Sequence, residues 1–230
     1  MTRHSEADAP ADTLADTLRA RLPAAARAWL SDATAAVAER PDRVDALLAV
    51  AGRACGRGPL PGGPRDPLPG GPAAPGWSTD DAVRVLLLTA LPCRGDELAA
   101  LLTRLYRHGD AAERRGVLRS LSFFRAPHAL GARAVPLVED ALRTNDARLV
   151  TAALGDYARR HLDPPAFHHG LLKCVFLGVP LAGVAPPPEP DAPELLRMLR
   201  DFAAERRAAG RPVPPDIEPF LSTSAGAEKE

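Results

Sequence analysis

The chain has 230 residues, 46% of them hydrophobic, which is enough apolar material for the core of one large domain or two small ones. It carries 29 basic and 29 acidic side chains, so its formal net charge is zero and overall charge does not draw it to nucleic acid or an anionic membrane. The N-terminus is polar and no apolar run approaches the ~18 residues of a membrane span, so neither a secretory leader nor a transmembrane helix is expected.

Residues 1–55 are expected to form N-terminal helices. Leu14, Leu18 and Leu22 mark a first helix from about residue 9, in which Pro23 is expected as a kink, and a second apolar stripe begins at Val44. Residues 56–76 differ, because Pro and Gly occupy 14 of these 21 positions and PLPGGP occurs twice. That content predicts a flexible surface loop with no specific role; a proline-motif ligand is the alternative.

Residues 77–221 are expected to form a helical core, followed by a disordered tail at 222–230, with one domain overall. Apolar stripes and start signals indicate further helices; they begin near Ser78, Leu98, Asp110, residue 129, Asn145 or Asp146, Asp163 and Asp191. The helix that follows Asn145 or Asp146 is expected to reach Tyr157. Strand signals are nearly absent. We therefore predict an all-α fold of about 8–10 helices, either an irregular helical-repeat (HEAT-like) array or a compact multi-helix bundle.

The stretch AFHHGLLKCVFLGVP at 166–180 places polar groups on an apolar helix that should be central. His168 and His169 diverge by about 100° on a helix, and Cys174 shares a face with neither. No metal-binding spacing occurs elsewhere, so no metal and no cofactor are expected. Three widely spaced cysteines, Cys55, Cys93 and Cys174, are typical of reduced thiols and favour a cytoplasmic protein.

Lys173 is the only charged residue between Gly170 and Pro180. A lysine in such surroundings needs polar company: it extends to solvent, pairs with an acid on another helix, or lines a ligand cavity. Glu205 and Arg206 raise a similar question on the last long helix, where Arg206 continues an apolar stripe. Either an internal Arg–carboxylate bond closes the core there, or Arg206 binds an anion or carbonyl at the mouth of a pocket.

Several of these polar groups resemble the EboA family of bacterial proteins over roughly residues 80–220. The matching elements are Arg143-Thr144-Asn145, Leu172-Lys173 with Phe176, Glu205-Arg206, and Ala209-Gly210-Arg211. The chain departs from the family pattern where Asp156-Tyr157-Ala158 replaces Asn-Pro-Tyr, and where His168 replaces an asparagine. The composition, rich in Ala, Pro, Gly and Arg, is itself typical of a GC-rich bacterial genome.

The resemblance implies a helical protein of unassigned activity. Genes of this family accompany a prenyltransferase-like membrane protein and TIM-barrel enzymes, in clusters associated with processing or export of secondary-metabolite precursors. Pathway proteins or a small-molecule metabolite are therefore the expected partners. We expect some of the polar positions to converge on a pocket centred on Lys173, with pure internal bracing as the alternative; the candidates are Arg143, Asn145, Asp156, His168, Lys173, Glu205 and Arg206.

Three functions stay open from the sequence. The first is a non-enzymatic helical adaptor or small-molecule-binding protein that serves such a pathway. The second is an enzyme of unknown reaction class, in which Lys173 acts with Glu205 and Arg206 as acid–base groups or as a Schiff-base amine. The third is a HEAT-like nucleic-acid-binding protein, which the zero net charge disfavours. Its local basic face would consist of Arg104, Arg107, Arg114, Arg115 and Arg119, or of Arg206, Arg207 and Arg211.

Overall fold

The computed structural model describes residues 9–60, 76–125, 129–188 and 192–222. In chain order the α-helices of these ranges are α1 (Ala9–Arg21), α2 (Ala24–Glu39), α3 (Val44–Cys55), α4 (Thr79–Thr89), α5 (Gly95–His108), α6 (Ala111–Ser120), α7 (Val135–Arg143), α8 (Ala147–Ala153), α9 (Asp156–His161), α10 (Pro164–Leu177), α11 (Pro193–Ala208) and α12 (Glu218–Ser222). Short 3₁₀ helices occupy Pro41–Arg43, Leu121–Phe123, Gly131–Ala134, Leu181–Gly183 and Pro215–Ile217.

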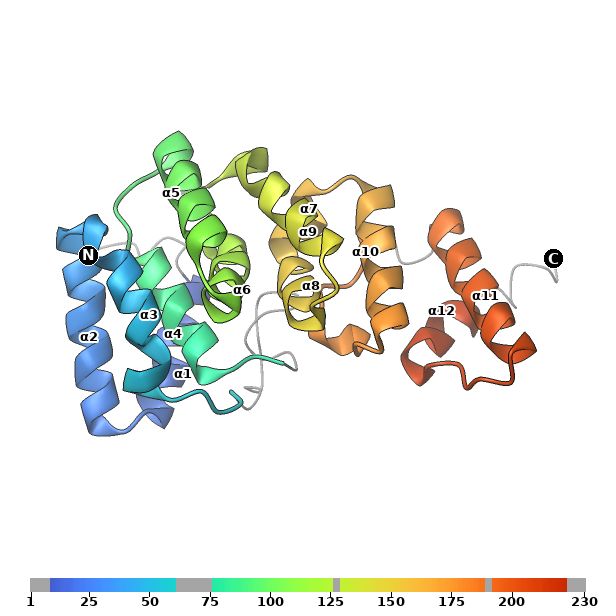
Figure 1. The fold of residues 1–230 in the computed structure, drawn as a ribbon, viewed down its shortest axis with the longest axis horizontal. Coiled ribbons are helices and arrows are strands. Elements are labelled where there is room, and N and C mark those ends of the chain that lie inside the picture. Colours follow the sequence, from blue (N-terminus) through green and yellow to red (C-terminus); the bar gives the residue numbers. More distant parts are fainter. Residues whose placement is uncertain (1–8, 61–75, 126–128, 189–191, 223–230) are drawn as a thin grey trace.

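The predicted all-α fold is confirmed, because the described ranges hold helices and one isolated β-bridge between Pro59 and Ser78. The helices follow one another along the long axis, from α1–α6 at one end through α7–α10 to α11 and α12 at the other (Figure 1). Most of the predicted Pro/Gly loop and of the C-terminal tail lies outside the described residues. Among the helices described, none has both the length and the apolar character needed to cross a bilayer.

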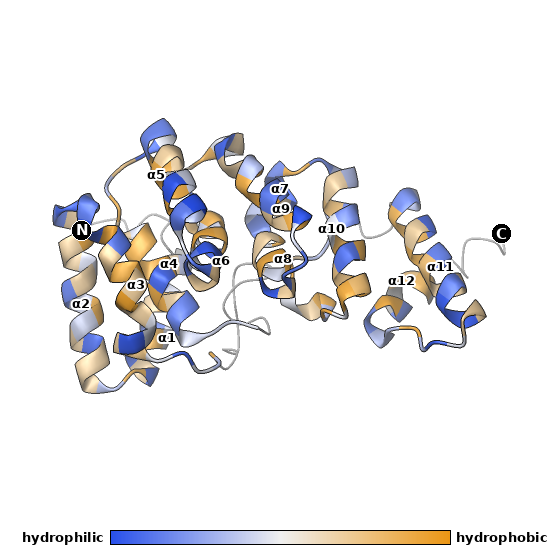
Figure 2. Ribbon diagram, in the orientation of Figure 1, coloured by the Kyte–Doolittle hydropathy of each residue, from blue (hydrophilic) through white to orange (hydrophobic). Residues whose placement is uncertain are grey.

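Helix α4 is the central element of the N-terminal half. It contacts α1, α2, α3 and α6, and each of its residues from Asp80 to Leu88 is buried. The sequence AVRVLLLT explains this position, since a helix that is apolar on nearly every side is stable only when other helices surround it. Towards the C-terminus, α8 takes the corresponding role and contacts α6, α7 and α10. Most other helices carry hydrophobic and hydrophilic residues interspersed along their length (Figure 2).

The local start signals form as expected. Ser78 and Asp81 make a reciprocal capping box at α4, as do Asp110 and Glu113 at α6. Of the two candidates for the next cap, Asp146 accepts a hydrogen bond from the Arg148 amide and opens α8. These signals could be predicted because each depends on residues within one helical turn.

Two helix boundaries differ from expectation. Pro23 does not kink one helix but occupies the N-cap position of α2, where α1 and α2 are separate helices. The single helix expected after Asp146 is two helices, because α8 ends at Ala153 and α9 starts at Asp156. Gly155 lies between them so close to the Ser122 hydroxyl that a Cβ there would be 2.9 Å from its oxygen. The same hydroxyl accepts a hydrogen bond from the Tyr157 amide, which fixes the start of α9.

Candidate functional site

Lys173, the centre of the predicted site, binds the end of another helix. Its ammonium group is half-buried and donates a hydrogen bond to the main-chain carbonyl of Leu142, at 2.7 Å. The last carbonyls of a helix have no partner within the helix, and a cation there is favoured by the helix dipole. The ammonium therefore stabilises the C-terminus of α7, beside Arg143, by an arrangement that sequence reasoning did not consider.

Asp156 is a buried acid with two basic partners. Its carboxylate accepts hydrogen bonds from Arg125, at 2.7 Å, and from Arg160, at 2.9 Å. The first bond joins the segment after α6 to the start of α9, and the second lies within α9. The carboxylate therefore ties two parts of the fold together.

The other predicted residues lie on several elements. Arg143 is exposed and contacts Asp140, and Asn145 is exposed in the turn before α8. His168 is buried in α10, whereas its neighbour His169 is exposed and contacts the carbonyl of Pro165. Lys173 reaches the end of α7 next to Arg143, and the convergence of all seven candidates on one pocket stays a prediction.

Glu205 and Arg206 lie on α11, at the far end of the molecule (Figure 1). Glu205 is exposed, and the Arg206 guanidinium donates to the carbonyl of Pro212, at 2.6 Å, and lies over the Phe202 ring. Phe202 in turn packs edge to face against Phe176 of α10, which is 62% exposed. Helix α10 is therefore less enclosed than its apolar sequence predicts.

Sequence reasoning missed a buried cluster of charged residues between α4 and α6. Its members are Asp80, Asp81, Arg84, Arg115 and Arg119, and all are buried except Arg115, whose side chain is 12% exposed. Arg84 pairs with Asp80 and donates to the carbonyl of Leu48, so it joins α4 to α3. A signal was present, since Arg84 is the only charged residue in AVRVLLLTAL, the same kind of anomaly that singled out Lys173.

Arg119 is the most constrained cation of this cluster. Its guanidinium lies 4.3 Å from the centre of the Trp77 ring, donates to the carbonyl of Gly76 at 2.8 Å, and is 3.3 Å from the Asp81 carboxylate. Burial lowers the pKa of Arg119 to about 10, against the opposing effect of Asp81. The group stays protonated at neutral pH but is held where water cannot solvate it.

Asp81 is shared between two guanidinium groups. Arg115 donates to both of its carboxylate oxygens, at 2.9 and 3.1 Å, and Arg119 approaches from the same helix one turn later. Because one carboxylate neutralises only one of the two cations, this part of the cluster has a net charge of +1. Asp80 and Arg84 neutralise each other nearby.

A hollow of about 530 Å³ opens beside these groups. We call it the central hollow; it is lined by Gly76, Ser78, Asp81, Arg115, Arg119, Ala147, Arg148, Thr151, Leu177, Gly178, Val179, Pro180 and Gly183. One wall, from α4 and α6, carries the charged cluster, whereas the end of α10 supplies Leu177, Val179 and Pro180. Hollows of 300–1,000 Å³ with mainly apolar walls and a few fixed polar groups are typical of small-molecule sites.

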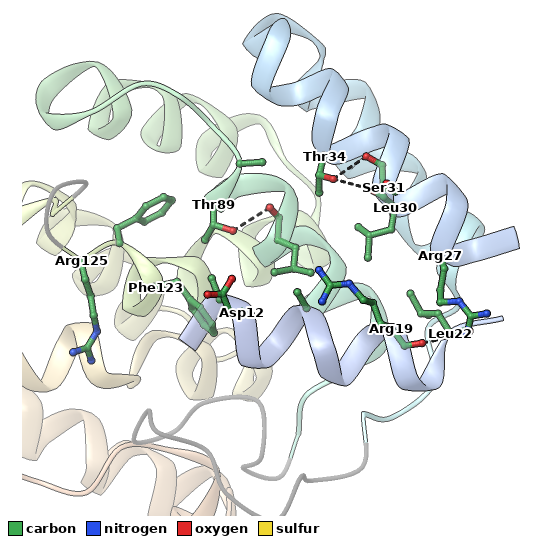
Figure 3. A pocket seen from close by; sticks show the side chains of 15 residues that line it. Asp12, Arg19, Leu22, Arg27, Leu30, Ser31, Thr34, Thr89, Phe123 and Arg125 are labelled. Carbon is green, nitrogen blue, oxygen red and sulfur yellow. Dashed lines mark hydrogen bonds between the residues drawn. The ribbon is translucent and has the colours of Figure 1, made fainter. Parts of the chain in front are cut away.

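A second hollow, of about 380 Å³, lies between α1 and α2, which both pack against α4 (Figure 3). Asp12 and Arg19 line it from α1, and Arg27, Leu30 and Thr34 line it from α2 (Figure 3). Its charged side chains are less confined than those of the central hollow, since Arg19 pairs with Asp16 and both are more than two-thirds exposed. Arg125, at the other end, is committed to Asp156.

Comparison with known families adds a decisive observation. Residues 69–221 match the family described as metabolite traffic protein EboA. The chain belongs to the EboA family. The matched region includes every residue that lines the central hollow. Helices α1–α3 precede the matched region, so the residues of α1 and α2 that line the second hollow lie outside it. No curated protein and no solved structure shows significant similarity to the chain.

Membership of the EboA family connects the chain with metabolites in broad terms. The matched residues form α4–α12, and the polar groups of these helices differ in what they contact. Groups of three or more His, Cys, Asp or Glu residues placed to hold a metal ion do not occur within the described ranges. What the region does offer a ligand is guanidinium groups beside apolar walls.

Proposed function

We propose that this EboA protein is a non-enzymatic carrier that binds a small amphipathic metabolite in the central hollow. The metabolite has one anionic group and an apolar body, and we place the protein in the processing or export of a secondary-metabolite precursor. The family's description supports a role in metabolite traffic. The structure supports the chemistry of the ligand, through the uneven distribution of charge around one hollow.

The observation that carries the proposal is an excess cation in the hollow. Three arginines line it, and whereas Arg148 pairs with Asp146, Arg115 and Arg119 share Asp81. Asp81 balances one of the two arginines, Arg115 and Arg119, so a ligand anion can balance the other. Arginine is suited to this task because its planar guanidinium offers paired donors to carboxylate, sulfate or phosphate oxygens. Arg119 is also held in place by Trp77 and Gly76, so little side-chain freedom is lost when a ligand binds.

The opposite wall supplies the apolar contacts. Leu177, Val179 and Pro180 follow one another at the C-terminal end of α10, where Gly178 adopts a left-handed conformation with φ of 69°. The left-handed residue ends the helix and brings the next residues to the hollow. A hydrophobic ligand body can replace water along this wall.

The groups that line the hollow favour binding over catalysis. Guanidinium groups remain protonated at physiological pH, even with the pKa of Arg119 lowered to about 10, so they do not act there as general bases. The Asp81 carboxylate is held by two arginines and the Ser78 amide. Lys173, the basis of the enzymatic alternative, is hydrogen-bonded to the end of α7.

We also propose a cytoplasmic location. Cys55, Cys93 and Cys174 are all buried and free, and burial raises the pKa of each thiol. Thiols of this kind behave as small apolar core residues, which suits a reducing compartment.

Two dyes of the same shape test the proposal. The fluorescent anion 8-anilinonaphthalene-1-sulfonate should bind the folded protein more tightly than N-phenyl-1-naphthylamine, which lacks the sulfonate. Replacing Arg115 (R115Q) should weaken binding of the anion by at least about tenfold, because a charged hydrogen bond contributes roughly 1.5–3 kcal/mol, and should leave the neutral dye nearly unaffected. Val179→Asp should weaken both.

Arg197→Gln is the matched control, since Arg197 is an exposed arginine of α11 that also pairs with an acid one turn away. Circular dichroism establishes that each variant is folded. Equal affinity of wild type and R115Q for the anionic dye would refute the anion end of the site. Turnover of a pathway intermediate by the purified protein would refute the non-enzymatic part.

A further inference from the structure

A second concentration of positive charge lines another hollow, which shares no lining residue with the central hollow. A hollow of about 640 Å³, here called the arginine hollow, is formed by α5, α6, the 3₁₀ helix Gly131–Ala134 and α7. Its lining is Thr103, Tyr106, Arg107, Arg114, Arg133, Pro136, Leu137, Asp140 and Arg143. Four arginines from separate elements therefore surround one concave space with a single carboxylate.

The charges of this hollow are not balanced within the protein. Arg114 donates to the carbonyls of Gly109 and Arg107, which are uncharged partners, and its guanidinium lies 5.3 Å from the centre of the Tyr106 ring. The Arg107 guanidinium is exposed and has no hydrogen bond or ion pair to any other described residue. Neither cation therefore has a neutralising acid among the described residues, and Arg107 is exposed to solvent.

Each of the other two arginines is paired with an acid of its own. Arg143 contacts one oxygen of Asp140 at 3.3 Å, and Arg133 pairs with Asp96, whose side chain is 90% exposed. The second oxygen of Asp140 accepts a hydrogen bond from the Tyr106 hydroxyl, at 3.0 Å. Burial, together with Asp140, raises the pKa of Tyr106 to about 12, so the phenol adds no negative charge. With Asp96 and Asp140 both counted, four cations against two anions leave a surplus of +2.

We infer that the arginine hollow binds the diphosphate group of a small molecule. A diphosphate carries two or more negative charges on adjacent groups and offers many acceptor oxygens, which matches paired donors that converge from α5, α6 and α7. The concave shape favours a compact anion over a nucleic acid duplex, which needs a row of cations along an extended face. The remaining volume accommodates the organic part of the ligand.

Three observations make Arg107 the best residue to test. It lines the hollow, its guanidinium is exposed, and no described acid pairs with it. Replacing it therefore breaks no ion pair on which folding depends. Arg143 is the second choice, because its contact with Asp140 is long and lies on the surface, where such pairs contribute little to stability.

The experiment is calorimetric titration of the full chain with inorganic pyrophosphate at low ionic strength. Wild type is expected to bind pyrophosphate more tightly than inorganic phosphate, with an affinity that falls as salt is added. Arg107→Gln should weaken pyrophosphate binding about tenfold, and R107Q/R143Q about a hundredfold. Arg53→Gln, which removes an exposed arginine of α3, should bind like wild type.

Three results would overturn the inference. The first is unchanged pyrophosphate affinity in R107Q/R143Q. The second is an equal loss in the Arg53 control, which would show that net charge alone is responsible. The third is tight binding of duplex DNA with a steep salt dependence and no measurable binding of pyrophosphate, which would assign these arginines to nucleic acid. Because R107Q leaves Arg115 in place, failure here is distinguishable from failure of the dye experiment.

Discussion

Two ion pairs with the same spacing have different surroundings in this protein. On α4, Asp80 and Arg84 are four residues apart and their side chains are 3% and 2% exposed. On α11, Arg197 and Asp201 have the same separation, but their side chains are 60% and 67% exposed. The separation of acid and base along the chain is the same, although their order is reversed, and the largest difference between the two pairs is their burial.

The contribution of an i, i+4 ion pair to stability depends on how far the pair is buried. An exposed pair competes with water and salt, and its contribution to stability is typically ~0.3–0.5 kcal/mol. A buried pair has lost its hydration, so loss of one partner leaves a charge that nothing solvates. Helix α4 is surrounded by four other helices, whereas α11 lies at the end of the molecule (Figure 1).

The largest expected effect comes from breaking the buried pair. Asp80→Ala leaves Arg84 without its carboxylate and should lower the free energy of unfolding by about 3–5 kcal/mol. Asp201→Ala, the matched change on α11, should cost less than about 1 kcal/mol. Chemical denaturation followed by circular dichroism measures both. Equal losses would show that burial does not separate the two pairs.

Acid titration sharpens the same contrast. Burial opposes the charged form of Asp80, but hydrogen bonds from Ser78 and Arg84 outweigh it and lower its pKa. A lowered folded-state pKa gives stability that is present above the unfolded value, about 3.9, and is lost as pH falls through the folded value. Below about pH 4 the free energy of unfolding should therefore fall with pH, and Asp80→Asn should reduce that slope by at most ~1.4 kcal/mol per pH unit. An identical slope in Asp80→Asn and wild type would contradict this.

The smallest expected effect concerns a cation that pairs with a neutral group. Lys173→Met removes the hydrogen bond to the Leu142 carbonyl and should cost about 1 kcal/mol. Arg206→Met is the control, since Arg206 binds the Pro212 carbonyl at a more exposed position and should cost less. Thermal unfolding compares the two. If Lys173→Met kept its stability but lost dye binding, the ammonium would serve a ligand instead of α7.

Features that depend on one helical turn could be predicted from the sequence. The two capping boxes and the cap at Asp146 are examples, because donor and acceptor are within three residues of each other. The apolar stripe that begins at Val44 is likewise the buried face of α3. The division between α8 and α9 could not be predicted, because it depends on Ser122, which is more than thirty residues earlier in the chain.

The candidate site was harder to predict for the same reason. An isolated charged residue in an apolar run indicates that it has a polar partner. The identity of that partner cannot be predicted from the neighbouring sequence, because it lies on another helix. Lys173 was noticed, but its partner is a main-chain carbonyl that has no sequence signature. The nucleic-acid alternative places Arg115 and Arg119 on a local basic face, whereas in the structure they share Asp81, on a helix that packs against their own.

The stacking of Arg119 on Trp77 has a practical consequence. The chain has only two tryptophans, and the other, Trp29, is on α2 and does not line the central hollow. A Trp29→Phe protein would emit from the buried indole alone. A ligand that displaces the Arg119 guanidinium would alter the fluorescence of Trp77, so intrinsic fluorescence can report ligand binding without an attached label.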